Sequence, residues 1–127
     1  RNKIITVGSS QYIVERLDNM STEALQSAAI ALLDELGIDS AVVLAGIPDF
    51  EQKTKVVLVT AFGSKIVSKG MHAGKFLGPV AKICGGGGGG RPNFAQAGGR
   101  EPKALDAALD FAKNELSQSL QKFSSCR

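Results

Sequence analysis

The sequence is poor in the residues that most often carry catalysis or bind metals. Its 127 residues include one histidine, His72, and two cysteines, Cys84 and Cys126. The two cysteines do not stand at the spacing of a zinc site, and two are too few for a disulfide framework. The sequence therefore predicts free thiols in a reducing compartment, with no metal, no cofactor and no disulfide.

Long apolar runs are also missing. No stretch reaches the roughly 20 apolar residues that a membrane-spanning helix needs, so no membrane partner is expected. The N-terminus, Arg-Asn-Lys-Ile-Ile, has neither an initiating methionine nor a signal-peptide pattern, which is typical of a fragment of a longer protein. With 43% hydrophobic residues, the chain can build the core of one domain. We expect this domain to span residues 1–127, with a core over about 12–121 and a frayed tail.

Acidic residues are absent from one continuous segment. Between Gly63 and Arg100 there are six basic residues and no Asp or Glu, although the net charge of the whole chain is only +3. The remaining nine basic and twelve acidic residues leave the rest of the chain at −3. A positive block beside a glycine-rich segment favours a polyanionic partner, although chance clustering on a solvated face would look the same.

Apolar periodicity predicts an α/β fold. Three runs of apolar and β-branched residues are expected to form strands: 12–17, 41–45 and 56–62. Three runs with apolar residues at helical spacing are expected to form helices: 21–37, 71–84 and 102–120. The second and third strands should form a hairpin across a turn at 46–54, buried on both faces. The element order predicts a single domain with a mixed β-sheet, helices packed on it, and a glycine-rich loop before the last helix.

Local signals mark the ends of these helices. Ser21 is a suitable N-cap and Gly37 a suitable residue just after the C-terminus of the first helix. Pro79 lies inside the second helical pattern, so that helix should be kinked or start late. Pro102 fits the first turn of the last helix.

The segment 83–99, ICGGGGGGRPNFAQAGG, raises the main question about function. Six glycines satisfy any glycine spacing, but Arg91 and Pro92 stand where a Walker loop needs lysine and a hydroxyl residue. A dinucleotide-binding turn is also excluded because the glycines follow a helical pattern rather than a strand. A flexible linker would not continue into Phe94 and its neighbouring alanines. Bare glycine backbone does allow a nucleic acid to approach closely, and its N–H groups can hold an anion.

No catalytic constellation accompanies this segment. We expect His72 to be a surface or capping residue, Cys84 a packed core thiol, and Phe94 a core residue rather than a stacking platform. Asn93 and Gln96 are candidates for phosphate or ribose contacts, or for capping backbone groups. The glycines themselves could serve only to pack the last helix against the sheet. These residues predict a binding module rather than an enzyme.

The stretch GGGGGGRPNFAQAGG resembles the glycine-rich motif of the C-terminal, DHH-associated domain of alanyl-tRNA synthetase. The stretches ERLDNMSTEALQSAAIALLDELG, SAVVLAG and HAGKFLGPVAKICGGGGGG follow the same family order, so the resemblance covers about residues 12–121. It implies a cytoplasmic, non-catalytic module that holds the elbow of alanine tRNA. Aminoacylation and editing would then lie in other domains of the parent alanine–tRNA ligase. It also implies a role in dimerisation in some lineages.

The resemblance and the charge pattern together define the candidate tRNA-binding residues. Those matching the family motif are Gly85, Gly86, Gly87, Gly88, Gly89, Gly90, Arg91, Asn93, Gln96, Gly98 and Gly99. The charge pattern adds Lys69, Lys75, Lys82 and Arg100. We expect a bulky residue at Gly98 to disrupt the segment.

Three alternatives follow from the same residues. Related phosphoesterase domains carry a histidine inside a shorter glycine motif, but Asn93 and Phe94 stand here, which disfavours phosphodiester hydrolysis. A second alternative is a homodimer face formed by the glycine segment and the last helix. A third is a general nucleic-acid binder that takes DNA as readily as tRNA.

Overall fold

A computed structural model describes residues 4–7, 10–47 and 55–125, so Cys126 and most of the predicted turn at 46–54 lie outside the described residues. The strands are β1 (Ile5–Val7), β2 (Ser10–Arg16), β3 (Ser40–Gly46), β4 (Val56–Phe62), β5 (Gly87–Gly90) and β6 (Phe94–Gly99). The helices are α1 (Thr22–Leu36), α2 (Ser64–Ser68), α3 (Ala73–Ile83), the 3-10 turn η1 (Pro102–Ala104) and α4 (Leu105–Ser125). Within these residues no helix is long and apolar enough to cross a membrane.

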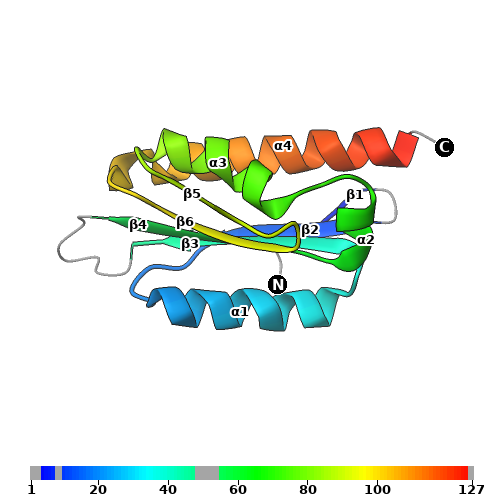
Figure 1. Cartoon of the computed structure of the whole chain (residues 1–127), viewed down its shortest axis with the longest axis horizontal. Helices are drawn as coiled ribbons and strands as arrows, with labels where there is room; N and C mark the ends of the chain where they lie inside the picture. Colours follow the sequence, from blue (N-terminus) through cyan, green and yellow to red (C-terminus); the bar gives the residue numbers. More distant parts are fainter. Residues whose placement is uncertain (1–3, 8–9, 48–54, 126–127) are drawn as a thin grey trace.

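The strands form one mixed sheet in the order β1-β2-β3-β4-β6-β5. Only β2 and β3 run parallel, and the other neighbouring pairs are antiparallel. Helix α1 covers one face of the sheet, and α3 and α4 cover the other (Figure 1). The predicted fold class, a mixed sheet with helices packed on it, is confirmed.

Helix α1 forms the crossover that makes β2 and β3 parallel. Its N-terminus is capped as predicted, because the N–H of Ala24 donates to Oγ of Ser21 at 3.1 Å. Its C-terminus ends at Gly37, whose φ of 99° favours glycine. Leu25 and Ala29 are fully buried against the sheet, and this burial stabilises the helix more than its intrinsic propensity does.

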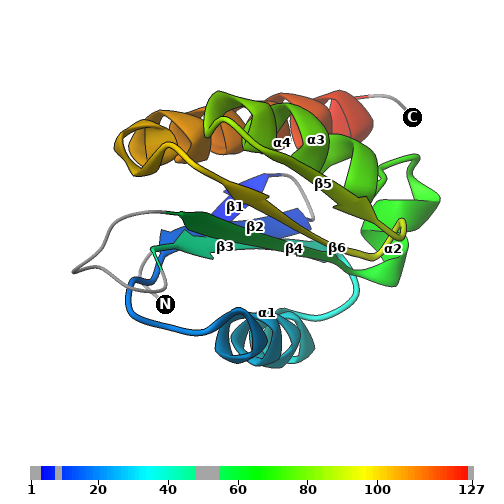
Figure 2. The ribbon, with the colours of Figure 1, turned by 60° about the vertical axis from the view of Figure 1, so that its left-hand side comes forward.

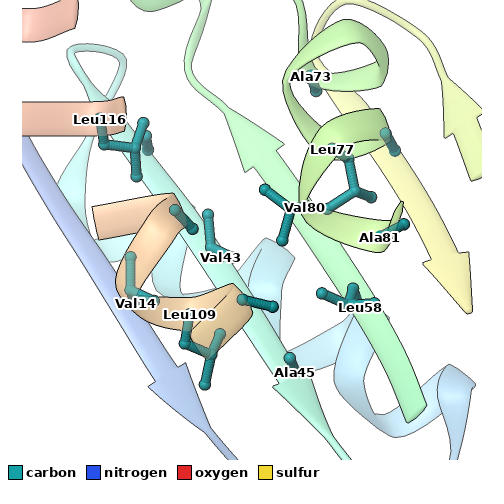
Figure 3. Close-up of a cluster of buried hydrophobic side chains, with 14 of the residues drawn as sticks. Val14, Val43, Ala45, Leu58, Ala73, Leu77, Val80, Ala81, Leu109 and Leu116 are labelled. Atoms are coloured by element: carbon teal, nitrogen blue, oxygen red, sulfur yellow. The ribbon is translucent and has the colours of Figure 1, made fainter. Parts of the chain in front are cut away.

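Strands β3 and β4 form the centre of the sheet as the predicted antiparallel hairpin. Every residue of both strands is buried, which confirms the expected burial on two faces. One hydrophobic cluster lies between the sheet and α1, and a larger one lies between the sheet and the pair α3 and α4. Figure 3 shows the larger cluster, where Leu77 and Val80 of α3 and Leu109 and Leu116 of α4 point towards the strands.

Thr60 in β4 provides a test of this core. Its side chain is fully buried, and its hydroxyl is the one buried side-chain polar atom without a hydrogen-bond partner in the described part of the chain. Burying an unpaired hydroxyl costs free energy, so Thr60→Val should raise the free energy of unfolding by about 1 kcal/mol in chemical denaturation. Thr60→Ser, which keeps the hydroxyl and removes a methyl group, should lower it. Destabilisation by Thr60→Val would show that the hydroxyl has a partner in solution.

The glycine segment is not the loop that the sequence predicts. Gly87–Gly90 form β5, which pairs antiparallel with β6 at the edge of the sheet. Figure 2 shows β5 running beside α3. Polyglycine carries no side-chain pattern, so its strand conformation comes from pairing with β6 and from contact with α3, neither of which is visible locally.

The remaining elements refine the predicted order. The second helix begins at Ala73 and continues through Pro79. Of the two predicted alternatives, the late start is therefore wrong, and the kink at Pro79 stays a prediction. Pro102 opens a 3-10 turn that leads directly into α4, close to its predicted place. The sequence reading missed β1 and α2, which have only three and five residues and therefore show little periodicity.

Candidate functional site

The turn between β5 and β6 is bonded to the N-terminus of α3. The N–H of Ala73 donates to the carbonyl of Pro92 at 2.8 Å, and the N–H of Gly74 donates to the carbonyl of Arg91 at 3.3 Å. The carbonyl of Asn93 accepts from Phe62 at the end of β4, at 2.9 Å. The turn is therefore fixed from both sides. The first N–H groups of α3 are occupied and do not form an anion site.

The opposite end of the hairpin is bonded to the C-terminus of α3. The N–H of Gly86 donates to the carbonyl of Ala81 at 3.0 Å. The carbonyl of Cys84 accepts from both Arg100 and Glu101, at 2.9 and 2.8 Å. Helix α3 thus brackets the glycine strand along its length, and the hairpin and the helix form one unit.

Gly86 and the glycines of β5 differ in the space available for a Cβ. A Cβ at Gly86 would overlap the carbonyl oxygen of Gly98, and one at Gly90 would lie 2.7 Å from the carbonyl oxygen of Phe94. A Cβ at Gly88 would lie 2.5 Å from Cα of Ala97. At Gly87 and Gly89 a Cβ would meet no atom within 4 Å. All four residues of the strand are solvent-exposed.

Four of the predicted cations lie in the backbone segments at the two ends of this hairpin. Lys75 follows Gly74, which is bonded to Arg91, so these two cations mark the turn end of the hairpin. Lys82 lies in the last turn of α3, close to the carbonyl of Cys84 that accepts from Arg100, so these two mark the open end. All four side chains are exposed, and none forms an ion pair with the part of the chain that the structure describes. The site therefore has a basic border at each end.

Lys69 does not join this group. Its Nζ lies 3.1 Å from Oδ1 of Asp39 and 2.9 Å from Oγ of Ser10, beside the starts of β2 and β3. Both charged side chains are mostly covered, at 24% and 18% exposure, so this ion pair has a structural role.

Two hollows lie over the hairpin on the face that carries α1. One, of about 580 Å³, is bordered by Lys55, Arg100 and the segment from Gly85 to Gly88. The other, of about 620 Å³, is bordered by Arg91, Phe94 and the carboxyl end of β5. Gln96 lines both, and its side-chain oxygen accepts a hydrogen bond from the amide of Gln26 in α1. Among the residues that the structure describes, no carboxylate lines either hollow.

Two residues of these hollows, Lys55 and Gln26, were not predicted from the sequence. Lys55 immediately precedes β4, and its neighbour Val56 pairs with Gly99, which brings the lysine to the glycine hairpin. Gln26 lies on α1, seventy residues from its partner Gln96. Neither position carries a local signal, because both depend on how β6 pairs with the sheet.

His72, Cys84 and Phe94 have structural roles. His72 is the N-cap of α3, and its Nδ1 accepts from the N–H of Lys75 at 3.2 Å, which confirms the predicted capping role. Burial raises the pKa of the Cys84 thiol, as expected for a core residue. Phe94 is half-buried and packs against the cluster beneath α1. Among the described residues no three His, Cys, Asp or Glu side chains gather as metal ligands would.

Comparison with known families gives one match over most of the chain. A family model described as the DHHA1 domain matches residues 9–118. The chain is also similar in fold to the crystal structure of the C-Ala domain of Aquifex aeolicus alanyl-tRNA synthetase. That likeness has a TM-score of 0.76 at 24% identity, and it covers 94% of this chain and 98% of the other.

Three of the curated relatives are named alanine–tRNA ligase. Alanine–tRNA ligases of two strains of Prochlorococcus marinus are each 60% identical, over 120 and 119 residues, and cover 94% of this chain. That of a Synechococcus strain is 55% identical over 116 residues and covers 91%. The chain spans only 13–14% of the length of these relatives.

Proposed function

Because the chain belongs to the DHHA1 domain family, we propose that it is the tRNA-binding module of an alanine–tRNA ligase. In this role it holds the elbow of alanine tRNA in the cytoplasm, while other domains of the ligase carry out aminoacylation and editing. The module itself does no chemistry. The chain is 60% identical to an alanine–tRNA ligase over 94% of its own length, which supports the assignment to that enzyme.

The observation that carries RNA binding is the exposed glycine strand between two pairs of cations. Lys75 and Arg91 at one end, and Lys82 and Arg100 at the other, are exposed and unpaired by any described carboxylate. Unpaired cations attract phosphates over several ångströms, and glycine backbone lets a polymer approach without side chains in the way. Four cations provide modest affinity, which attachment to the rest of a ligase would raise by increasing the effective concentration.

A fluorescence-anisotropy titration tests this function. The ligands are alanine tRNA, the same tRNA with its elbow disrupted by mutation, and duplex DNA of equal charge, each at low and at physiological salt. Preference for the intact elbow, with affinity falling as salt rises, is the expected result. Equal binding to all three ligands would reduce the module to a general charged surface. No binding, together with a mass that increases with concentration, would favour dimerisation instead.

The ion pair of Lys69 makes a further prediction. Lys69→Ala should lower the free energy of unfolding by about 1 kcal/mol, because it leaves Asp39 and Ser10 without their shared donor. Its affinity for alanine tRNA should stay within about twofold of the unmodified chain. Lys82→Ala is the matched control. It should lower the affinity for alanine tRNA and leave the free energy of unfolding unchanged. A loss of affinity for tRNA in Lys69→Ala, with unchanged stability, would show that Lys69 belongs to the binding surface.

A further inference from the structure

Two large hydrophobic side chains are exposed on or directly after α1. Ile30 is 51% exposed, and Ile38, which follows the terminal Gly37, is 65% exposed. Single exposed apolar residues are ordinary at a protein surface. These two, however, border adjoining hollows that share Leu33 and Phe62, so they belong to one continuous apolar surface.

A groove of about 600 Å³ lies between the C-terminal half of α1 and the short helix α2. Leu33 and Ile38 form its apolar wall on the α1 side, and Phe62, Val67 and Pro92 line it from the other side. We call this hollow the α1 groove. It has the size and the lining of a site that takes large apolar side chains.

The segment that carries Ile38 is fixed in place by α2. The carbonyl of Ile38 accepts a hydrogen bond from the N–H of Lys65 at 3.0 Å, and the N–H of Gly63 donates to the carbonyl of Ser40 at 2.8 Å. A Cβ at Gly63 would lie 2.2 Å from the carbonyl oxygen of Ile38, so the two backbones approach closely. Because this backbone is held, the exposure of Ile38 is a fixed feature of the fold.

The charge beside the groove is negative. Asp34 is the one charged side chain that lines it among the described residues, and it forms no ion pair with them. Helix α1 carries the acids Glu23, Asp34 and Glu35 and no Lys or Arg. In the last turn of a helix the macrodipole favours a base over an acid, so Asp34 opposes the stability of α1. A choice of this kind is expected where a partner supplies the positive charge.

This charge selects among possible occupants of the α1 groove. The phosphates of RNA are repelled by Asp34, unlike at the basic borders of the glycine hairpin. Two copies of the chain that paired through α1 about a two-fold axis would bring acids towards acids. A protein segment with an apolar side chain next to a lysine or arginine complements both the lining and Asp34.

The rest of the ligase is a source of such a segment. The chain spans only 13–14% of the length of the alanine–tRNA ligases that it matches, so in the proposed function most of the enzyme lies outside this domain. Ile4, the first residue that the structure describes, packs against the cluster beneath α1. The chain thus enters the domain on the face that carries α1. Covalent linkage also gives any segment of the same ligase a high effective concentration at the groove.

We propose that the α1 groove docks another part of the same ligase, through a segment that places an apolar side chain between Ile38 and Val67 and a lysine or arginine beside Asp34. This inference rests on the part of the proposed function that assigns the chain to a ligase. The domain then has two faces with separate tasks. The basic hairpin meets RNA, and the acidic, apolar side of α1 meets protein.

Photo-crosslinking in the full-length ligase that carries this chain tests the docking. Benzoylphenylalanine in place of Ile38 should form a crosslink within one molecule, to a peptide outside these 127 residues that contains a lysine or arginine near the attachment point. Mass spectrometry identifies that peptide. The matched control places the same group at Asn114, which is exposed on α4 across the sheet, and should give no such product. A yield at position 38 no higher than at position 114, or a product that joins two copies or RNA, would overturn the proposal.

Charge reversal tests the role of Asp34 in the same crosslinking assay. Asp34→Lys should lower the yield of the crosslink from position 38 about fivefold, while the stability of the domain stays equal or rises, because a base suits the end of α1. Asp110→Lys makes the same change of charge on α4 and should leave the yield unchanged. Equal yields in the two variants would contradict the charge pairing.

The docking and the tRNA-binding function can fail separately. Ile38→Ser in the isolated chain should leave its affinity for alanine tRNA within about twofold of the unmodified chain. If the isolated chain binds tRNA and the ligase gives no specific crosslink from position 38, only the docking proposal fails. If the crosslink forms and the isolated chain does not bind tRNA, only the tRNA-binding function fails.

Discussion

Gly88→Val is expected to unfold the β5–β6 hairpin and to lower the free energy of unfolding by about 3 kcal/mol or more. A Cβ at Gly88 would lie 2.5 Å from Cα of Ala97 and 2.5 Å from the carbonyl oxygen of Gln96, so backbone rather than side chain would have to move. The hairpin is bonded to α3 at both ends, so the strain cannot be relieved at the hairpin alone. Chemical denaturation followed by circular dichroism measures the loss.

Gly89→Val is the matched control for this prediction. It places the same side chain one residue further along the strand, where a Cβ meets no atom within 4 Å. Its stability should remain within about 0.5 kcal/mol of the unmodified chain, as for other open surface positions. An equal loss in both variants would mean that the two faces of β5 are not distinguished as described. The sequence predicted that a bulky residue at Gly98 would disrupt the segment. In the structure a Cβ at Gly98 would lie at an ordinary contact distance from the carbonyl oxygen of Val56.

The double variant Arg91→Ala, Arg100→Ala should weaken binding of alanine tRNA on the order of 30-fold at low salt, with little change in stability. These side chains are exposed and border the two ends of the glycine strand, so they contribute to capture of phosphates and not to the core. Each lost phosphate contact should also reduce the slope of log affinity against log salt by about one. Anisotropy titrations at several salt concentrations measure both quantities.

A charge-matched control accompanies this variant. Lys65→Ala, Lys113→Ala also removes two exposed positive charges, from α2 and α4, outside both hollows of the hairpin. Its affinity for tRNA should fall by less than about threefold, through the change in net charge alone. An equal loss in both double variants would show that net charge, rather than the placement of Arg91 and Arg100, determines binding.

Elements with local signals were predictable from the sequence. Helix α1 combines a capping serine at Ser21, apolar residues at helical spacing and a terminal glycine at Gly37, and all three signals agree with the structure. Strands β3 and β4 are continuous apolar runs buried on both faces. In each case the residues that determine the element lie inside it.

The glycine strand and the two hollows beside it depend on distant partners. Nothing within Gly87–Gly90 favours a strand, and its conformation depends on pairing with β6 and on backbone bonds to α3. Likewise Lys69 looked like its neighbours in the basic block, but Asp39, thirty residues earlier, pairs with it. Local composition could identify the region of the site. It could not assign each residue to a face.

The bracketing of β5 by α3 also bears on self-association. The edge strand of a sheet offers unpaired N–H and carbonyl groups to any other extended chain, and proteins usually protect such edges with charged side chains, proline or bulges. Polyglycine has no side chain to do this. Here the N–H of Gly86 donates to the carbonyl of Ala81. A Cβ on Gly74 would lie within 2.9 Å of both the nitrogen and the oxygen of Gly90. The helix thus covers the two ends of this edge against strand addition, while the broad face of the strand stays open to solvent.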